Sequence, residues 1–238
     1  MVATSRITVV VPTRNEAHNI GTFLESLPAE VRLIVIDSST DETPRTVVAE
    51  RPENTTIVLA EANIPEARQL GADLVTTPWI LYTDADVELA PDYAEQLARL
   101  QLGPDVAGIA GSKLTAGGHE AYHDAFKAGQ ALLDFVGIPA ATGSNMLVRT
   151  DVLREVGGFD PALSVNEDTE LMFRIKRAGY KVEYAPQLAV NSFDHRRLES
   201  GAFRKWFHSF TRCLLLWAAP KSRLVRKGDW GYWRQLAH

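Results

Sequence analysis

Two pairs of acidic residues stand where carboxylates could do chemistry. In the first, Asp84 and Asp86 flank Ala85 directly after the predicted strand 79–83. Two carboxylates one residue apart at the end of a strand can both reach a divalent cation, and hard oxygen ligands suit Mg²⁺ or Mn²⁺. Such a cation would neutralise the charge that builds on a leaving diphosphate. A solvated acidic loop would have the same residues, so their place in the fold decides between the two interpretations.

Glu167 and Asp168 form the second pair, on or just before a segment with helical character. Direct displacement by an acceptor hydroxyl requires a carboxylate that accepts the proton of that hydroxyl. Basic residues one helical turn later, Arg174, Lys176 and Arg177, could hold the segment in place. The alternative is an acidic helix N-terminus that the helix macrodipole stabilises.

Asp37 follows a second apolar run, 31–36, and precedes hydroxyl and acidic residues up to Thr43. An aspartate here can accept a hydrogen bond from the imide N–H of a nucleobase, while the hydroxyls and the helix start serve ribose or phosphate. Thr40 or Asp41 is expected to cap the next helix. Capping does not account for Asp37, which we interpret as a contact to the base.

His195 lies in a basic stretch with Arg196 and Arg197. A neutral imidazole could be a further metal ligand, and the two arginines could contact a diphosphate. The alternative is a solvated basic turn that contains a structural histidine.

The elements that would position these groups alternate between strand and helix. Apolar, β-branched runs predict strands at 7–11, 31–36, 55–60 and 79–83, and helices are predicted between and after them at 16–27, 43–51, 65–75 and 91–102, the first capped by Asn15. This order implies a parallel sheet covered on both faces. Ligands of such sheets bind at the carboxyl ends of the strands. The polar residues above are therefore expected to converge on one edge.

The second half of the chain is more mixed. It predicts strands at 106–110, 143–149 and 181–185, helices at 119–136 and 167–178, and a glycine-rich turn at 157–160. A chain of 238 residues fits one large domain better than two.

Taken together, these segments resemble the family 2 glycosyltransferases, over roughly residues 5–197. Residues 9–16 look like the opening strand and nucleotide-contacting loop of that family, and residues 67–71 match its A-R-N-x-G segment with Gln69 for asparagine. Residues 37–43 resemble its D-G-S-x-D-x-T stretch, although Ser38 replaces the glycine and Ile36 stands where a second acid is common. Residues 84–86 fall at its D-x-D position, 143–149 look like its acceptor-side strand, and 157–171 match G-G-F-D…E-D-x-x-L.

The resemblance implies an α/β fold of the GT-A, Rossmann-like type, with a mostly parallel sheet flanked by helices. It implies an inverting transfer of a sugar from a nucleotide-diphosphate sugar, UDP ahead of GDP, to an acceptor hydroxyl or phosphate, with Mn²⁺ or Mg²⁺ as cofactor. The residues that would take part are the catalytic base Asp168; the donor-binding Pro12, Thr13, Arg14, Glu16, Asp37, Arg68, Asp84 and Ala85; the metal ligands Asp84, Asp86 and His195; the acceptor-side Gly143, Ser144, Asn145 and Glu167; and the diphosphate-contacting Arg196 and Arg197.

We expect a catalytic domain at 1–197, with a nucleotide-sugar-binding half at 1–110 and an acceptor half at 111–197, and an amphipathic helical tail at 198–238. Aromatic residues recur at mostly helical spacing among basic ones in this tail, which is typical of a helix in a membrane interface. Peripheral membrane contact through 199–227 would agree with a lipid-linked acceptor such as a polyprenyl phosphate. Packing of the aromatic face on the catalytic core or on a second subunit is the alternative, and the sequence weighs the two equally.

The net charge, the cysteine content and the length of the apolar runs exclude some classes of protein. The net charge of −5 argues against a nucleic-acid binder. The single cysteine, Cys213, excludes an internal disulfide and suits a reducing compartment. No run reaches the ~20 apolar residues of a membrane span, and the N-terminus does not resemble a signal peptide. We therefore expect a cytoplasmic protein, with the cytoplasmic membrane face as its peripheral site.

Two other functions are compatible with parts of the pattern. A non-catalytic nucleotide-sugar-binding protein could share the fold, although it would not need a base such as Asp168. A nucleotidyltransferase would also combine a parallel sheet with acidic metal ligands. It would be expected to have a glycine-rich phosphate loop after the first strand, where this chain has Pro12-Thr13-Arg14-Asn15.

Overall fold

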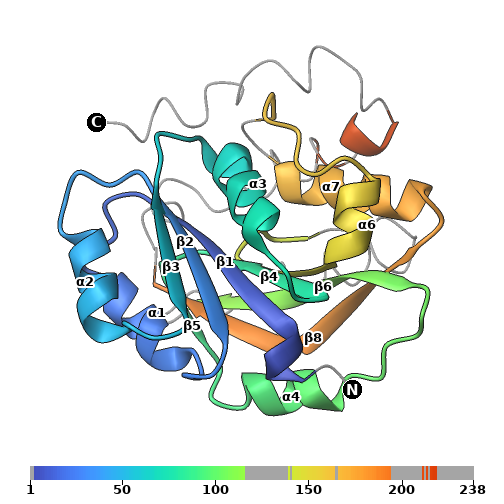
Figure 1. The fold of residues 1–238 in the computed structure, drawn as a ribbon. Coiled ribbons are helices and arrows are strands. Elements are labelled where there is room, and N and C mark those ends of the chain that lie inside the picture. Colours follow the sequence, from blue (N-terminus) through green and yellow to red (C-terminus); the bar gives the residue numbers. More distant parts are fainter. Residues whose placement is uncertain are drawn as a thin grey trace.

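The computed structural model describes residues 3–115, 139, 141–163, 166–193, 211, 213 and 215–218. In this part of the chain, eight strands form one sheet with helices on both faces, in the order β3-β2-β1-β4-β7-β6-β8-β5 (Figure 1). The predicted helix at 119–136 lies outside the described residues. So do three of the predicted site residues, His195, Arg196 and Arg197.

The first four strands of the sheet, β3, β2, β1 and β4, are mutually parallel, as predicted. β7 runs antiparallel to both β4 and β6, β6 is parallel to β8, and β5 is antiparallel to β8. The predicted α/β fold class is confirmed, with a mixed sheet beyond β4. The strands are β1 Ile7–Thr13, β2 Arg32–Asp37, β3 Thr55–Leu59, β4 Trp79–Thr83, β5 Val87–Leu89, β6 Val106–Thr115, β7 Asn145–Arg149 and β8 Lys181–Ser192.

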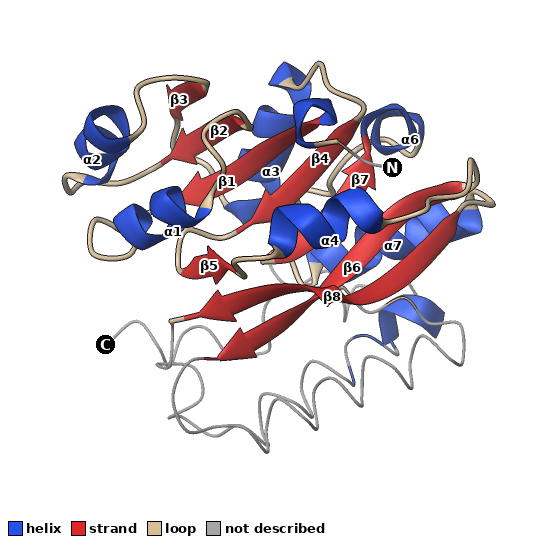
Figure 2. Cartoon of the chain, turned by 90° about the horizontal axis from the view of Figure 1, so that it is seen from below, coloured by secondary structure: helices blue, strands red, loops and turns tan. Residues whose placement is uncertain are grey.

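Helices cover the sheet on both faces and create two apolar clusters. Val9 and Val11 of β1 point to the cluster beneath α1 and α4, the helices nearest the viewer in Figure 2. Val10, between them, points to the cluster beneath α3, α6 and α7. Because both faces are buried, the strand is apolar at every position rather than at alternate ones. The helices are α1 Ile20–Ser26, α2 Thr43–Glu50, α3 Ile64–Leu74, α4 Tyr93–Arg99, α6 Thr150–Glu155 and α7 Glu167–Arg177, preceded by a 3-10 turn, Thr4–Arg6.

The first helix begins later than predicted. Asn15 has a φ of 57°, in the left-handed region, and α1 starts at Ile20 rather than at residue 16. The Asn15 side chain does not cap this helix, because its Oδ1 accepts a hydrogen bond from the N–H of Thr40 at 2.8 Å. The segment between β1 and α1 is therefore a loop bound to the next loop of the same sheet edge.

Two strands of the second half are longer than predicted. β6 continues to Thr115 and β8 to Ser192, because the two strands pair with each other along most of their length. The short elements β5 and α6 were not predicted, since three and six residues are too few to show a period.

Gly71 of α3 packs against Val10 of β1, and a Cβ at Gly71 would overlap the Val10 Cγ1 methyl. Gly71→Ala is expected to lower the free energy of unfolding by about 1–3 kcal/mol, the usual cost of overpacking a core. This loss exceeds the gain of about 0.5–1 kcal/mol that alanine brings to a helix. Urea unfolding measures the change.

Gly21→Ala in α1 is the matched control. Its Cβ would meet only the carboxylate end of Glu50, at 3.1 Å, and that flexible side chain can move. This variant is expected to be as stable as the wild type or slightly more so. Equal unfolding midpoints for Gly71→Ala and the wild type would contradict close helix–strand packing here.

Candidate active site

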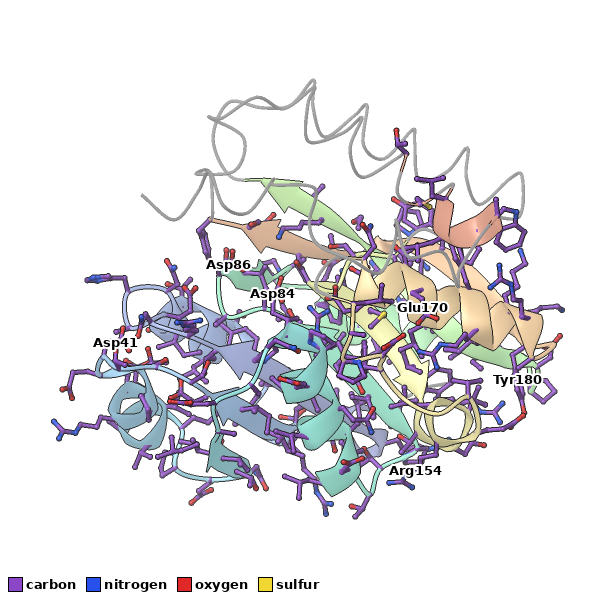
Figure 3. All side chains as sticks on the ribbon, turned by 90° about the horizontal axis from the view of Figure 1, so that it is seen from above. Asp41, Asp84, Asp86, Arg154, Glu170 and Tyr180 are labelled. Atoms are coloured by element: carbon purple, nitrogen blue, oxygen red, sulfur yellow. The ribbon has the colours of Figure 1, made fainter. Side chains whose placement is uncertain are left out.

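The carboxyl ends of β1, β2 and β4 lie side by side at one edge of the sheet. Thr13 and Asp37 are partners in the parallel ladder between β1 and β2. Asp84 directly follows Thr83, the last residue of β4, and β4 pairs with the other side of β1. Figure 3 shows Asp84 and Asp86 close together beyond this edge, with Asp41 further out toward α2. The predicted convergence of these polar residues on one edge of the sheet is therefore found.

Asp37 joins the loops that follow β1 and β2. It is 2% exposed, and its Oδ1 accepts hydrogen bonds from the hydroxyls of Thr13 at 2.5 Å and Ser39 at 2.6 Å. Its Oδ2 accepts from the N–H of Ser39 at 3.1 Å. The N–H of Asn15 in turn donates to Ser39 Oγ at 2.7 Å. The carboxylate thus organises a polar surface, on which Arg14 is exposed.

The outer part of this surface lies at the start of α2. Asp41 accepts hydrogen bonds from the N–H of Thr43, at 3.0 Å, and from its hydroxyl, at 2.5 Å. The N-cap residue is Glu42, without a side-chain cap, so neither Thr40 nor Asp41 takes the predicted N-cap position. Thr43 also accepts a bond from the N–H of Glu16 at 2.9 Å. Pro12 and Glu16 are half-buried in the same region.

Arg68 connects the two acidic pairs. It is 2% exposed, and its guanidinium donates through Nη1 to Glu167 and through Nη2 to Asp84 Oδ1, the latter at 3.2 Å. A capping box between Asn63 and Glu66 fixes the start of α3, the helix that carries Arg68. Side chains from the first and second halves of the chain are therefore held by one buried cation.

Asp168 lies in the first turn of α7, next to Glu167. Its Oδ2 accepts a hydrogen bond from the N–H of Gly143 and its Oδ1 one from the N–H of Thr169, both at 2.6 Å. A Cβ at Gly143 would overlap the Arg68 guanidinium, so only glycine brings this N–H to the carboxylate. Both oxygens of Asp168 are thus oriented by main-chain donors.

Burial moves both acids of this pair toward neutrality. It raises the pKa of Asp168, against the lowering influence of Arg68 and of the two main-chain N–H groups. Burial also raises the pKa of Glu167 to about 7, which Arg68 opposes and the neighbouring charge of Asp168 favours. A carboxylate with a raised pKa at such a position suits the role of a base.

Asp84 and Asp86 are half-buried on either side of Ala85, which is buried among apolar side chains. Asp84 accepts from Arg68 through Oδ1 and from the Ser144 hydroxyl through Oδ2. Among the described residues, no three His, Cys, Asp or Glu side chains are grouped so as to hold a metal ion, and His195 lies outside them. The carboxylate oxygens of Asp84 and Asp86 nevertheless match the chemistry of Mg²⁺ or Mn²⁺.

The predicted acceptor-side residues have different surroundings. The Asn145 side chain is fully buried; it accepts from the Tyr93 hydroxyl at 2.7 Å and donates to the carbonyls of Ser112 and Leu188, each at 2.9 Å. Asn145 therefore braces the floor of the site, whereas the neighbouring Ser144 carries the hydroxyl that donates to Asp84.

Lys113 is a neighbour of the predicted site residues that the sequence did not reveal. It is half-buried near the end of β6, and its Nζ donates to Ser144 Oγ at 2.9 Å, which places it next to Asp84. The sequence predicts that this strand ends at residue 110, whereas β6 continues to Thr115 and carries Lys113 near the end of its pairing with β8. Lys113 was therefore not expected to belong to a strand.

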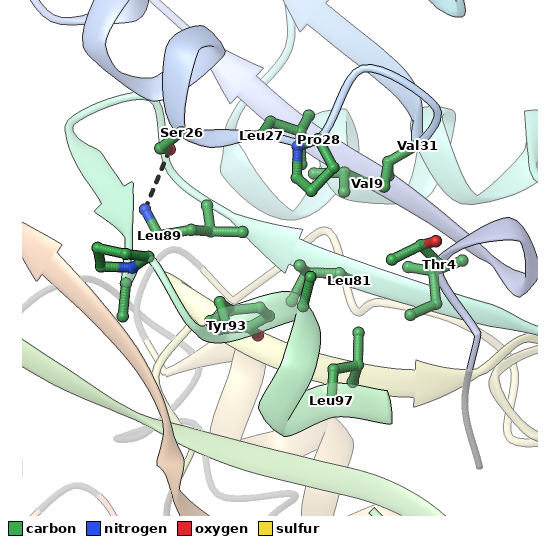
Figure 4. A pocket seen from close by; sticks show the side chains of 14 residues that line it. Thr4, Val9, Ser26, Leu27, Pro28, Val31, Leu81, Leu89, Tyr93 and Leu97 are labelled. Atoms are coloured by element: carbon green, nitrogen blue, oxygen red, sulfur yellow. Dashed lines mark hydrogen bonds between the residues drawn. The ribbon is translucent and has the colours of Figure 1, made fainter. Parts of the chain in front are cut away.

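A separate apolar pocket lies toward the amino end of β1, on the face covered by α1 and α4 (Figure 4). Its lining includes Val9, Leu81 and Leu97 but no carboxylate, imidazole or basic side chain. The N–H of Leu89 donates to Ser26 Oγ at 3.1 Å along its wall. Asp37 and Asp84 are at the opposite end of β1, where β2 and β4 finish.

A Rossmann-like sheet of this strand order, with acidic pairs at its carboxyl edge, defines the GT-A class of folds, and solved structures of that class superpose on it. The chain belongs to glycosyltransferase-like family 2, whose model matches residues 5–208.

Two curated relatives illustrate the range of the family. The chain is 27% identical over 224 residues to a pre-mycofactocin glycosyltransferase of Mycobacterium tuberculosis, covering 85% of this chain and 46% of the relative. It is 29% identical over 210 residues to a succinoglycan biosynthesis protein of Rhizobium meliloti, covering 73% and 59%. The chain thus spans about half the length of the curated relatives that it matches.

Two solved structures support the fold. A mannosyltransferase from Pyrobaculum calidifontis, in complex with GDP-Man and Mn²⁺, is similar with a TM-score of 0.72 at 22% identity, over 94% of this chain and 65% of that one. Glucosyl-3-phosphoglycerate synthase of Mycobacterium tuberculosis, in complex with Mn²⁺, UDP-glucose and phosphoglyceric acid, is similar with a TM-score of 0.60 at 20% identity, over 87% and 79%.

Proposed function

We propose that this chain is an inverting glycosyltransferase that moves a sugar from a nucleotide-diphosphate sugar, UDP ahead of GDP, to an acceptor hydroxyl or phosphate. The observation that carries the proposal is the buried Arg68, which holds Asp84 of the donor-side pair and Glu167 of the acceptor-side pair in one network. Residues 1–110 would bind the donor and residues 111–197 the acceptor.

Each side chain of the network has a distinct task in this proposal. The loops joined by Asp37 would receive the nucleobase, and Asp84, oriented by Arg68 and Ser144, would contact the ribose. Asp168 would take the proton of an attacking hydroxyl, its oxygens aimed by the N–H groups of Gly143 and Thr169. Glu167 stays ion-paired with Arg68 and keeps that guanidinium in place.

Mn²⁺ or Mg²⁺, held by Asp86 with Asp84 and His195, would supply positive charge that stabilises the leaving nucleoside diphosphate. Two carboxylates and an imidazole are suitable ligands for these ions. Complexes of the two structural neighbours with Mn²⁺ support the assignment. Arg196 and Arg197 would add positive charge beside the diphosphate.

The acceptor and the location belong to the same proposal. A lipid-linked acceptor, reached at the cytoplasmic face of a membrane through residues 199–227, agrees with the aromatic and basic composition of that stretch. No helix among the described residues combines the length and the apolarity needed to cross a bilayer.

A thermal-shift screen of UDP, GDP, ADP and CDP, each with and without Mn²⁺, tests the donor class. UDP with Mn²⁺ is expected to raise the melting temperature most, because a ligand at about 100 times its Kd stabilises the native state by about 2.7 kcal/mol. For a chain of this size that is a shift of about 5–10 °C.

Asp86→Asn is the companion variant for the metal. It is expected to abolish the additional shift that Mn²⁺ brings. A larger shift with GDP would correct the base assignment, and no shift with any nucleotide would contradict the proposed function. Binding without any turnover of the matching sugar nucleotide would favour the non-catalytic alternative.

A further inference from the structure

The described residues near the C-terminus pack on the helix that carries Asp168. Residues 211, 213 and 215–218 are helical and lie beside α7 (Figure 1, red; Figure 3). Cys213 and Leu216 form an apolar cluster with Phe173 of α7 and with Leu163. Leu216 is 0%, Phe173 1% and Cys213 5% exposed. The sequence left open whether this part of the tail contacts a membrane or packs on protein. The described residues pack on α7.

Trp217 reinforces this contact at the rim of the cluster. Its ring meets the ring of Phe173 edge-on, with centroids 5.2 Å apart and an interplanar angle of 69°. The guanidinium of Arg177, in the last turn of α7, lies 5.5 Å from the centre of the Trp217 ring and donates to the Trp217 carbonyl at 2.6 Å. One aromatic residue thus contacts α7 at two successive turns.

The opposite face of α7 is held by the core of the sheet. Leu171, Met172 and Ile175 belong to the cluster shared with α3 and α6. Phe173 faces the other way, so its burial depends on Cys213, Leu216 and Leu163. The helix is therefore packed between two layers, and removal of the outer layer would free one of its sides.

The segment also comes within electrostatic range of the base. Burial, with the charge of Asp168 as a further cause, raises the pKa of the Cys213 thiol to about 12. Asp168 itself is buried, and its carboxylate accepts hydrogen bonds from the N–H of Gly143 and from the N–H of Thr169 in the first turn of α7. A small rotation or shift of α7 would therefore move the carboxylate relative to its target.

We propose that the helical residues 211, 213 and 215–218 form a clamp that holds α7, and through it Asp168, in the geometry required for transfer. Leu216 and Trp217 are then positioning residues for the base. That the clamp packs on α7 follows from the contacts described above, whereas its effect on transfer rests on the proposed function. The experiment therefore has two parts, one that measures the packing and one that measures transfer.

Cys213 is the only cysteine of the chain and reports on docking without any assay of activity. In the full-length chain its reaction with a chromogenic disulfide reagent is expected to be about 100-fold slower than in urea, because a buried thiol is inert. Trp217→Ala is expected to accelerate the reaction about 10-fold or more. Ala218→Ser, at an exposed position of the same segment, should leave the rate unchanged.

The second part measures turnover of the sugar nucleotide that the thermal-shift screen selects. Trp217→Ala is expected to lower kcat by about 10- to 100-fold, the cost of a small misplacement of a catalytic group. KM for the donor should stay within about twofold, because the donor-side loops are untouched. Trp217→Phe keeps an aromatic ring against Phe173 and should restore most of the lost rate. The acid limb of the pH profile should move to lower pH in Trp217→Ala, because a less buried Asp168 loses part of its raised pKa.

The outcomes separate the two parts. A native thiol that reacts as fast as the unfolded one would overturn the docking. A thiol exposed by Trp217→Ala with kcat unchanged would overturn the positioning role and leave the proposed function intact. A slow thiol in a chain that turns over no donor would contradict the proposed function, and the positioning role with it, while docking stands.

Discussion

Asp168→Asn is expected to lower the rate of transfer by about 10²- to 10⁴-fold, the contribution of a positioned general base. Asparagine has nearly the same shape but cannot take the proton of an acceptor. The measurement is release of the nucleoside diphosphate from the selected donor, with water and with a panel of hydroxyl compounds as acceptors. The thermal shift caused by the nucleotide should remain, since the main-chain donors to Asp168 among the described residues, Gly143 and Thr169, lie outside the loops proposed to bind the donor.

Asp92→Asn makes the same chemical change at the exposed residue that precedes α4 and serves as the control. It should retain wild-type activity. Equal transfer rates for Asp168→Asn and Asp92→Asn would show that Asp168 is not the base. The wild type should also lose activity on the acid side at a pH above the usual range of an aspartate, because only the ionised form accepts a proton and burial raises its pKa.

Arg68→Met is expected to reduce the free energy of unfolding by about 3–5 kcal/mol, the usual result of removing one partner of a buried ion pair. Methionine roughly preserves the volume but leaves Glu167 without its cation, in surroundings where both side chains are less than one-tenth exposed. Asp84, the second partner, is one-third exposed, so water screens most of its loss. Urea unfolding at several pH values measures the effect.

The pH dependence of Arg68→Met has a definite sign. Without Arg68 the pKa of Glu167 rises above the value of about 7 that it has in the wild type, while in the unfolded chain it stays near 4.5. A raised pKa means that the folded state binds more protons than the unfolded state between these values. Stability contributed by the protonated form is therefore lost as pH increases. The variant should be more destabilised at pH 8 than at pH 5.

Combining Arg68→Met with Glu167→Gln is the control for this interpretation. The double variant has no buried ionisable group at position 167, so its stability should vary less with pH between 5 and 8 and should exceed that of Arg68→Met at pH 8. If the single variant is as stable as the wild type at every pH, the ion pair is not the link between the two acidic pairs.

The first half of the fold could be predicted because its signals are local. Strands such as β2 are apolar at nearly every position, and polar residues such as Asp37 and Asp84 mark where each strand ends. The rule for parallel sheets then brings those ends together without knowledge of any distant contact. Predictions for α1 and β6 were less accurate because a left-handed Asn15 and the pairing of β6 with β8 set their ends.

The partners inside the site could not be predicted in the same way. Arg68 was assigned to the donor from its motif, but its contact with Glu167 joins residues 99 positions apart. The brace between Tyr93 and Asn145 spans 52 positions. Such pairs depend on how helices lie on the sheet, and the composition of either segment alone contains no sign of them.

The hydrogen bonds that join the loops after β1 and β2 have a consequence for the speed of recognition. Asn15, Asp37 and Ser39 fix both loops to each other before any nucleotide arrives. Their conformational entropy is therefore lost during folding rather than during association. Nucleotide capture should then resemble docking to a preformed surface, with association rates that change little among nucleotides and with discrimination expressed as differences in residence time.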